Sequence, residues 1–395
     1  MNYVPSTRRR VVGALAAAGT AVLVDPGPVL ARLLQDRDCG TTEPLGTLLG
    51  TIPLFRTGGQ VQPFGVKVGG RGLDARLVTD LSSLDPDHLI TPASRAFVRT
   101  ETPPGLRQKP WSITLSGASG DERSVTIADL TKHARAMGPH LLECSGNNNP
   151  ANFGLMSVCE WDGVLLSDVL SDWRRSDVGT NVVLSGMDPG ERSVDSVAGA
   201  SWVFPLASVD RVGPFLAVRM NGEPLPSDHG APVRLVVPGW YGCTWIKWVN
   251  DIRLAGDDEP ATSQMKEFAG RTHQNARHDL ARDYTPADIH VAATPIRVEK
   301  RRTPQGIDYR VVGIVWGGEK PVDRLAIRFN AKDTWIPFSI CPAPRSAKTW
   351  SLWEYRWKPS APGLYEISLS APDRSVPQRR LDSGYYMRQV RIDEI

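Results

Sequence analysis

The sequence predicts an α+β protein, in which a mixed α/β domain is followed by a β-sandwich. In the first half, an alternating segment from Trp111 to Leu115 precedes a segment from Ile127 to Met137 whose apolar residues recur at helical spacing. From residue 291 onward the chain changes to short alternating segments separated by turns, such as 309–316 and 323–329. Alternation of this kind is typical of the half-buried strands of a β-sandwich.

The composition is that of an ordinary globular protein. The chain has 395 residues, of which 41% are apolar and 23% are charged, enough for one large or two medium domains. The net charge of +3 comes from 46 basic and 43 acidic residues, so it gives no indication of nucleic-acid binding. We therefore expect no nucleic-acid partner.

Residues 1–31 have the layout of a twin-arginine export signal. Arg8 and Arg9 precede an apolar run from Gly13 to Val24, which is too short for a comfortable membrane span. A basic N-terminus without a targeting role is the alternative. The signal predicts export to the periplasm in a folded state. Residues 32–84, rich in glycine, are expected to be an extended segment that wraps a larger domain.

The stretch from His140 to Pro150 presents a cysteine at the end of a predicted strand. Leu141 and Leu142 end the strand, and the run Ser-Gly-Asn-Asn-Asn-Pro predicts a sharp loop with Cys144 at its tip. By spacing alone, a single cysteine is more often a small buried apolar residue. The five cysteines are odd in number and include no Cys-x-x-Cys pair, so neither a zinc site nor a disulfide framework is expected.

A second cluster, residues 220–248, places two cations on predicted strands. Val233 and Leu235 share one face, which leaves Arg234 on the other, and Lys247 is similarly isolated on the next strand. An arginine fork and a lysine point charge beside the tight turn at 239–242 form a credible clamp for a phosphate-bearing cofactor. His229 is a further hydrogen-bond donor. The alternative is that all three lie on the surface of a sheet.

Three motifs resemble the sulfite oxidase family of molybdenum enzymes. Residues 143–147, Glu-Cys-Ser-Gly-Asn, resemble the Cys-Ala-Gly-Asn loop of that family, and residues 97–99 resemble its Phe-Val-Arg segment. The order His-Gly-x-Pro-Val-Arg followed by Lys-Trp is similar in residues 229–234 and 247–248. The resemblance covers about residues 85–395 and is weakest between 256 and 290.

The resemblance implies a molybdenum-molybdopterin cofactor with Cys144 as the metal ligand. Arg99 is implied beside the metal and an anionic substrate, and the expected catalytic residues are Cys144, Arg99 and Tyr241. The implied cofactor-binding residues are Arg99, Cys144, Asp188, His229, Arg234, Trp245, Ile246 and Lys247. The implied domains are a molybdopterin-binding oxidoreductase domain at 85–285 and an immunoglobulin-like domain at 286–395. In the family the second domain often mediates dimer formation, so a homodimer is expected.

The sequence departs from the family pattern around the substrate. Thr244 stands where sulfite-oxidising members have an arginine, Ala200 aligns with a tyrosine, and Asn148 and Asn149 replace arginines. The pocket is therefore expected to be less positive and more aromatic, and to hold an uncomplexed sulfite dianion less strongly. This favours an organic or carrier-bound sulfur compound as the small substrate.

Three functions stay open at this point. The first is two-electron oxo transfer that oxidises sulfite or a related sulfur compound and passes electrons to a separate haem protein, a c-type cytochrome. No Cys-x-x-Cys-His motif occurs, and the segment before Phe97 has no room for a fused haem domain, so a separate partner is expected. The second is reduction of an S- or N-oxide, as in the methionine sulfoxide reductase branch. The third is molybdopterin binding without turnover.

Overall fold

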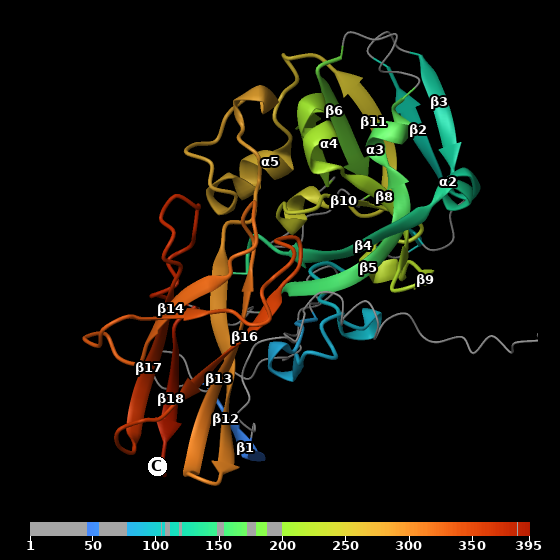
Figure 1. Cartoon of the computed structure of the whole chain (residues 1–395). Helices are drawn as coiled ribbons and strands as arrows, with labels where there is room; N and C mark the ends of the chain where they lie inside the picture. Colours follow the sequence, from blue (N-terminus) through green and yellow to red (C-terminus); the bar gives the residue numbers. More distant parts are fainter. Residues whose placement is uncertain are drawn as a thin grey trace, which may run out of the picture.

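The chain forms two sheet-rich parts that lie one above the other in Figure 1. The computed structural model describes residues 46–54, 77–103, 105–106, 111–117, 121–147, 154–171, 179–187, 200–384 and 386–395. The predicted export signal at 1–31, Asp188, Asn148 and Asn149 lie outside the described residues. No helix in the described ranges is long and apolar enough to cross a membrane.

One sheet of the first part is antiparallel and carries the Cys144 loop. Its order is β10-β8-β5-β4, with β9 paired to β8. The strands are β4 (Arg135–Glu143), β5 (Met156–Leu165), β8 (Phe215–Met220), β9 (Glu223–Pro224) and β10 (Arg234–Val236). Because β4 ends at Glu143, Cys144 begins the turn that follows this strand.

The other sheet of this part is mixed, with the order β3-β2-β11-β6-β7. Only the β11–β2 pair is parallel. The strands are β2 (Ser112–Ser116), β3 (Glu122–Thr126), β6 (Asn181–Gly186), β7 (Ser201–Pro205) and β11 (Val249–Ala255). Short helices accompany the two sheets: α2 (Ile127–His133), α3 (Leu166–Val169), α4 (Leu206–Val212) and α5 (Ser263–Phe268).

The predicted helix from Ile127 to Met137 is shorter than expected. A capping box between Thr126 and Asp129 starts α2, but the helix ends at His133 and β4 begins at Arg135. Gly138 has a φ of 82°, and Pro139 follows it, so the chain cannot continue as a helix there. Residues 135–137 belong to β4 instead, where Arg135 and Ala136 pair with Gly163 and Asp162 of β5.

The second part contains two antiparallel four-stranded sheets, β1-β12-β13-β16 and β15-β14-β17-β18. Their strands are β12 (Ala292–Thr303), β13 (Gly306–Trp316), β14 (Arg324–Arg328), β15 (Ile336–Ser339), β16 (Ser351–Trp357), β17 (Gly363–Ser370) and β18 (Arg388–Ile392). Phe329, which follows β14, stacks on Trp357 of β16 at 4.2 Å between ring centroids. This contact packs one sheet on the other, while an immunoglobulin-like topology stays a prediction.

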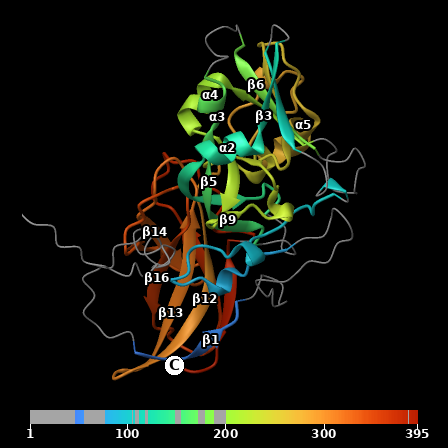
Figure 2. The same cartoon turned by 90° about the vertical axis from the view of Figure 1, so that its right-hand side faces the viewer.

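The N-terminal segment belongs to the second part. Strand β1 (Thr47–Ile52) pairs antiparallel with β12, with Thr47 opposite Arg302 and Ile52 opposite Val298. Figure 2 shows β1 lying along the edge of these strands. The predicted segment 32–84 therefore does not only wrap the first domain, because part of it completes a sheet of the last one.

The cysteines differ from the expectation in one respect. Cys144, Cys159 and Cys243 are free and buried, as a chain without a disulfide framework requires. Cys341, however, is disulfide-bonded. Cysteine spacing could not reveal this bond, because pairing depends on which chain segments meet in space.

Candidate active site

A cavity of about 130 Å³ gathers side chains from five separate segments of the first part. These segments are 97–100, 142–144, 228–234, 242–247 and 264–268, and Ala200 adds a single residue from a sixth place in the chain. Among the predicted site residues, the cavity lining includes Arg99, Cys144, His229, Arg234, Trp245, Ile246 and Lys247. The three motifs, which are far apart in the sequence, therefore meet at one place.

The turn after β4 holds the Cys144 thiol through main-chain hydrogen bonds. Cys144 N donates to Leu155 O at 2.9 Å, and Asn147 N donates to Cys144 O at 2.8 Å. The N–H of Gly146 points at the sulfur, 3.4 Å away. Burial raises the pKa of the Cys144 thiol, while the positive charge of Arg99 and the Gly146 N–H oppose that rise. The thiol is thus protonated by default, and coordination to a metal would remove its proton.

Arg234 is a buried cation whose partners are main-chain carbonyls. It is 3% exposed, and it donates from Nη1 to His229 O at 3.0 Å and from Nη2 to Trp245 O at 3.3 Å. Its Nε finds no hydrogen-bond partner among the described residues. Burial lowers the pKa of Arg234 to about 10, which indicates a guanidinium that lacks full compensation. The rings of Trp161 and Trp245 lie 5.3 and 5.6 Å from its charge.

Lys247 lies opposite Arg234. The prediction that it belongs to a strand is wrong. The two residues form an isolated antiparallel bridge, and β11 begins only at Val249 because Trp248 adopts a left-handed φ of 53°. The Lys247 ammonium donates to Asp228 O at 3.0 Å and to Thr100 O. All three residues of β10 are buried, so Arg234 does not lie on the surface of a sheet, and it lines the cavity instead.

Gly230 allows these two cations to approach each other. Its φ is +108°, and a Cβ there would lie 3.0 Å from Arg234 Cβ and 3.1 Å from Lys247 Cβ. Any side chain would therefore strain the backbone and press on both cations. The neighbouring His229 uses its Nε2 to bond Ala93 O at 3.1 Å, and burial lowers its pKa to about 4. His229 is thus neutral, and that nitrogen is already engaged.

Tyr241, predicted to be catalytic, does not line the cavity. Its hydroxyl shares a hydrogen bond with His273 Nε2 at 3.2 Å, and Arg379 lies 5.3 Å from its ring. The 3₁₀ turn Gly242–Thr244 directs Tyr241 toward the second part of the chain, while Trp245 and Ile246 face the cavity. Thr244 is also turned away, since it is fully buried and donates to Tyr241 O at 2.9 Å.

Several residues that line the cavity were not predicted as site residues. Cys243 and Ala200 line the cavity, as do Gln264 and Phe268 of α5. Cys243 lies within residues 220–248, so its place in the sequence could have indicated that it lines the site. Gln264 and Phe268 stand one helical turn apart, in the region where the resemblance is weakest, and only that spacing hinted that they share a face.

The donor set fits a sulfur-ligated, phosphate-bearing cofactor. Within the described residues, no group of three His, Cys, Asp or Glu side chains could hold a bare metal ion. A metal bound by Cys144 therefore needs further ligands from a cofactor. The partnerless Nε of the buried Arg234, beside Lys247, is suited to an anionic group such as a phosphate. The cavity thus contains both a sulfur ligand for the metal and cations for a phosphate group.

Comparison with known proteins agrees with this chemistry. A family model described as an oxidoreductase molybdopterin binding domain matches residues 100–263. The matched region and the site thus define a molybdopterin-binding domain, and the predicted cofactor class is confirmed. The chain is similar in sequence and in fold to the sulfite oxidase family of molybdenum-dependent oxidoreductases.

Similar proteins include sulfite oxidases and a sulfane dehydrogenase. The mitochondrial sulfite oxidase of Homo sapiens is 26% identical over 321 residues, which cover 76% of this chain and 57% of that protein. The sulfite oxidase of Gallus gallus is 27% identical, covering 73% of this chain and 68% of that protein. In fold, the chain resembles the sulfane dehydrogenase SoxCD from Paracoccus pantotrophus, with a TM-score of 0.60, 19% identity, and coverage of 83% of this chain and 89% of that one.

Proposed function

We propose that this protein performs two-electron oxo transfer at the sulfur of a small compound and passes the electrons to a separate haem protein. The main support for this proposal is that Cys144, Arg99, Arg234 and Lys247 line the same cavity. When bound, the molybdenum-molybdopterin cofactor supplies the two-electron redox chemistry and the oxygen that is transferred. The net oxidation places one oxygen from water on sulfur and releases two protons and two electrons.

The chain's own residues bind and orient the reactants. Cys144 would supply the protein's sulfur ligand to the metal. Arg234 and Lys247 would hold the anionic part of the cofactor, because both line the cavity and are anchored there by hydrogen bonds to main-chain carbonyls. Arg99, which acts electrostatically on the thiol, would attract an anionic substrate to the same side.

The cavity lining supports a substrate other than free sulfite. Thr244, at the position of a family arginine, is fully buried and bonded to Tyr241 O, so it offers the cavity no charge. Neutral side chains line this region instead: Ala200, Cys243, Trp245, Gln264 and Phe268. A sulfite dianion would lose at least one charge-assisted contact there, whereas an organic or carrier-bound sulfur group would pack against the apolar surface.

A Cys144→Ser variant tests the proposal. Removing the thiolate ligand is expected to abolish sulfur-dependent cytochrome reduction and to lower molybdenum content, while the far-UV circular dichroism spectrum stays unchanged. Cys159→Ser is the matched control, because Cys159 is also a free buried thiol but does not line the cavity. Equal turnover and metal content in Cys144→Ser and the native protein would refute the assignment.

Reduction of an S- or N-oxide is the second candidate, and the neutral lining formed by Gln264 and Phe268 favours it. A neutral sulfoxide needs a hydrogen-bond donor and apolar surface more than it needs a cation. Two assays on the cofactor-loaded protein decide between oxidation and reduction of the substrate. One follows cytochrome reduction by sulfur compounds, and the other follows oxidation of a reduced dye by sulfoxides. Binding without turnover would show full molybdenum content and no rate in either assay.

Export to the periplasm and transfer to a c-type cytochrome belong to the same proposal. The twin arginines at residues 8–9 support export, and the disulfide at Cys341 suits an oxidising compartment. The two released electrons need an acceptor, and the chain carries no Cys-x-x-Cys-His motif for a covalent haem. We also propose a homodimer through the second part, to be tested by analytical ultracentrifugation.

A further inference from the structure

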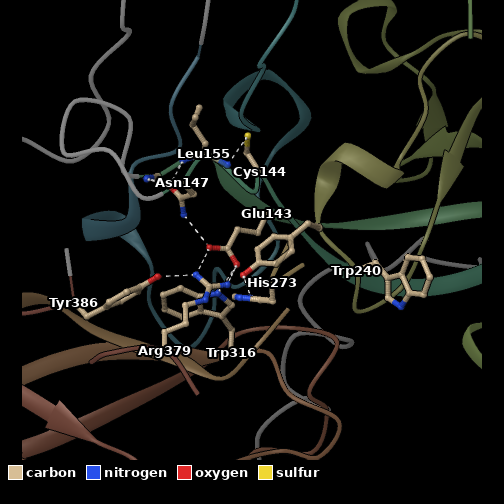
Figure 3. A network of polar contacts seen from close by, with 12 residues as sticks. Glu143, Cys144, Asn147, Leu155, Trp240, His273, Trp316, Arg379 and Tyr386 are labelled. Atoms are coloured by element: carbon tan, nitrogen blue, oxygen red, sulfur yellow. Dashed lines mark hydrogen bonds and ion pairs between the residues drawn. The ribbon is translucent and has the colours of Figure 1, made fainter. Parts of the chain in front are cut away.

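A fully buried carboxylate stands directly before the Cys144 thiol. Glu143 is 0% exposed, and its two oxygens accept four hydrogen bonds. Arg379 donates from Nη1 to Oε1 at 2.8 Å and from Nη2 to Oε2 at 2.7 Å. Trp316 Nε1 donates to Oε2 at 2.8 Å, and Asn147 Nδ2 donates to Oε1 at 3.2 Å. Figure 3 shows Arg379 and Trp316 on one side of the carboxylate and Asn147 on the other side, where Cys144 also lies.

Asn147 extends this network into the turn that carries the thiol. Its side-chain oxygen accepts from Gly154 N at 2.9 Å and from Leu155 N at 3.0 Å. Leu155 in turn accepts the Cys144 N–H through its own carbonyl. The carboxylate of Glu143 thus orients Asn147, and Asn147 ties both ends of the turn together around Cys144.

The cation that neutralises Glu143 comes from the second part of the chain. Arg379 N donates to Val291 O at 3.0 Å, and its Nη1 also contacts the Tyr386 hydroxyl at 2.7 Å. These contacts within the second part hold the Arg379 guanidinium in position independently of its pairing with the carboxylate. A bidentate pair of this kind specifies geometry as well as charge.

We propose that Arg379 is a positioning residue for Cys144, acting through Glu143 and Asn147. The inference rests on the proposed function in one respect, namely that Cys144 is the metal ligand. Without Arg379, the buried carboxylate would be left with two neutral donors, Trp316 and Asn147, and it would draw Asn147 or water toward itself. Either response moves the turn, and with it the sulfur that must meet the metal at a set distance.

Domain attachment alone does not account for this arrangement. Other contacts join the two parts without touching the turn after β4: Trp350 Nε1 donates to Leu89 O at 2.9 Å, and Leu141 N donates to Lys348 O at 2.6 Å. The Glu143–Arg379 pair differs from them because it begins one residue from the thiol and continues through Asn147. A variant at Trp350 therefore separates attachment from positioning.

The test compares Arg379→Met, the double variant Glu143→Gln/Arg379→Met and the control Trp350→Phe. In the cofactor-free proteins, alkylation of Cys144 by iodoacetamide at neutral pH is followed by peptide mass spectrometry. We expect Arg379→Met to accelerate alkylation several-fold. The double variant should restore much of the native rate, because a neutral glutamine leaves no unpaired charge and still accepts from Asn147. Trp350→Phe should alkylate at the native rate.

The cofactor-loaded proteins provide a second readout. Loss of Arg379 is expected to lower metal affinity by roughly 10-fold to 100-fold and to change the molybdenum(V) electron paramagnetic resonance spectrum. Arg379→Lys keeps the positive charge and loses the bidentate hydrogen bonds. If Arg379→Met does not fold, Arg379→Lys takes its place, and its metal affinity should fall by a smaller factor. Alkylation rates and spectra in the Arg379 variants equal to those of Trp350→Phe would overturn the proposal. The alkylation result stands independently of turnover, so failure of the proposed function would appear separately, as an active Cys144→Ser variant.

Discussion

Replacing Arg234 by methionine should separate the stability of the empty protein from its capacity to bind cofactor. Arg234 is buried in β10 and bonded only to carbonyl oxygens, at His229 and Trp245, in the contacts that the structure shows. Methionine keeps much of the apolar volume between the Trp161 and Trp245 rings and removes the charge. The variant therefore asks whether this cation is retained for folding or for binding.

The expected change in the free energy of unfolding follows from the pKa. Burial lowers the pKa of Arg234 from 12.5 to about 10, and at neutral pH, below both values, the native state carries the charge at a cost of roughly 3 kcal/mol. Methionine removes that cost but leaves the two carbonyls unsatisfied, at roughly 1 kcal/mol each. The cofactor-free variant should thus be as stable as the native protein, or more stable by about 1 kcal/mol.

Urea unfolding of the cofactor-free proteins and molybdenum content after loading form the assay. The variant should unfold at the same or a higher urea concentration, yet bind cofactor roughly 10-fold to 100-fold more weakly, because a charge-assisted contact to an anion is lost. Arg388→Met is the control, since Arg388 is a buried arginine in β18. It should lower stability and leave metal content unchanged. Destabilisation of the empty protein by several kcal/mol in Arg234→Met, or native metal content, would refute the reasoning.

Three further predictions concern packing, pH and export. In Gly186→Ala, a Cβ would lie 2.2 Å from the Lys247 carbonyl oxygen, so we expect a lower melting temperature and less bound molybdenum; native values for both would contradict this packing. Burial lowers the pKa of His140 and His229 to about 4, against about 6.5 when unfolded, so the unfolded state binds more protons between these values and stability should fall as the pH drops from 6.5 to 4. A melting temperature that holds or rises over this range argues against neutral buried histidines. Replacing both arginines at residues 8–9 by lysine should retain the protein in the cytoplasm, and a normal periplasmic level in cell fractions would exclude the twin-arginine route.

Local patterns in the sequence predicted the resemblance to the sulfite oxidase family, the cofactor class and part of the cavity lining. Each motif places its functional residue by short-range geometry: Cys144 follows a strand at a turn, and Arg234 and Lys247 stand in short segments around a glycine-rich turn. Such features depend on neighbours within a few residues, so periodicity and turn residues suffice to predict them. The alternating segments after residue 291 likewise predicted the strands of two packed sheets.

Only the tertiary structure decided how distant segments combine. The Glu143–Arg379 pair joins residues 236 positions apart, and β1 pairs with β12 across a similar separation. The rotation of Tyr241 away from the cavity follows from its contacts with His273 and Arg379, which no local pattern encodes. Pairing across such distances is selected by the burial and hydrogen bonding of the whole chain, because a side chain's partner is whichever group folding places beside it.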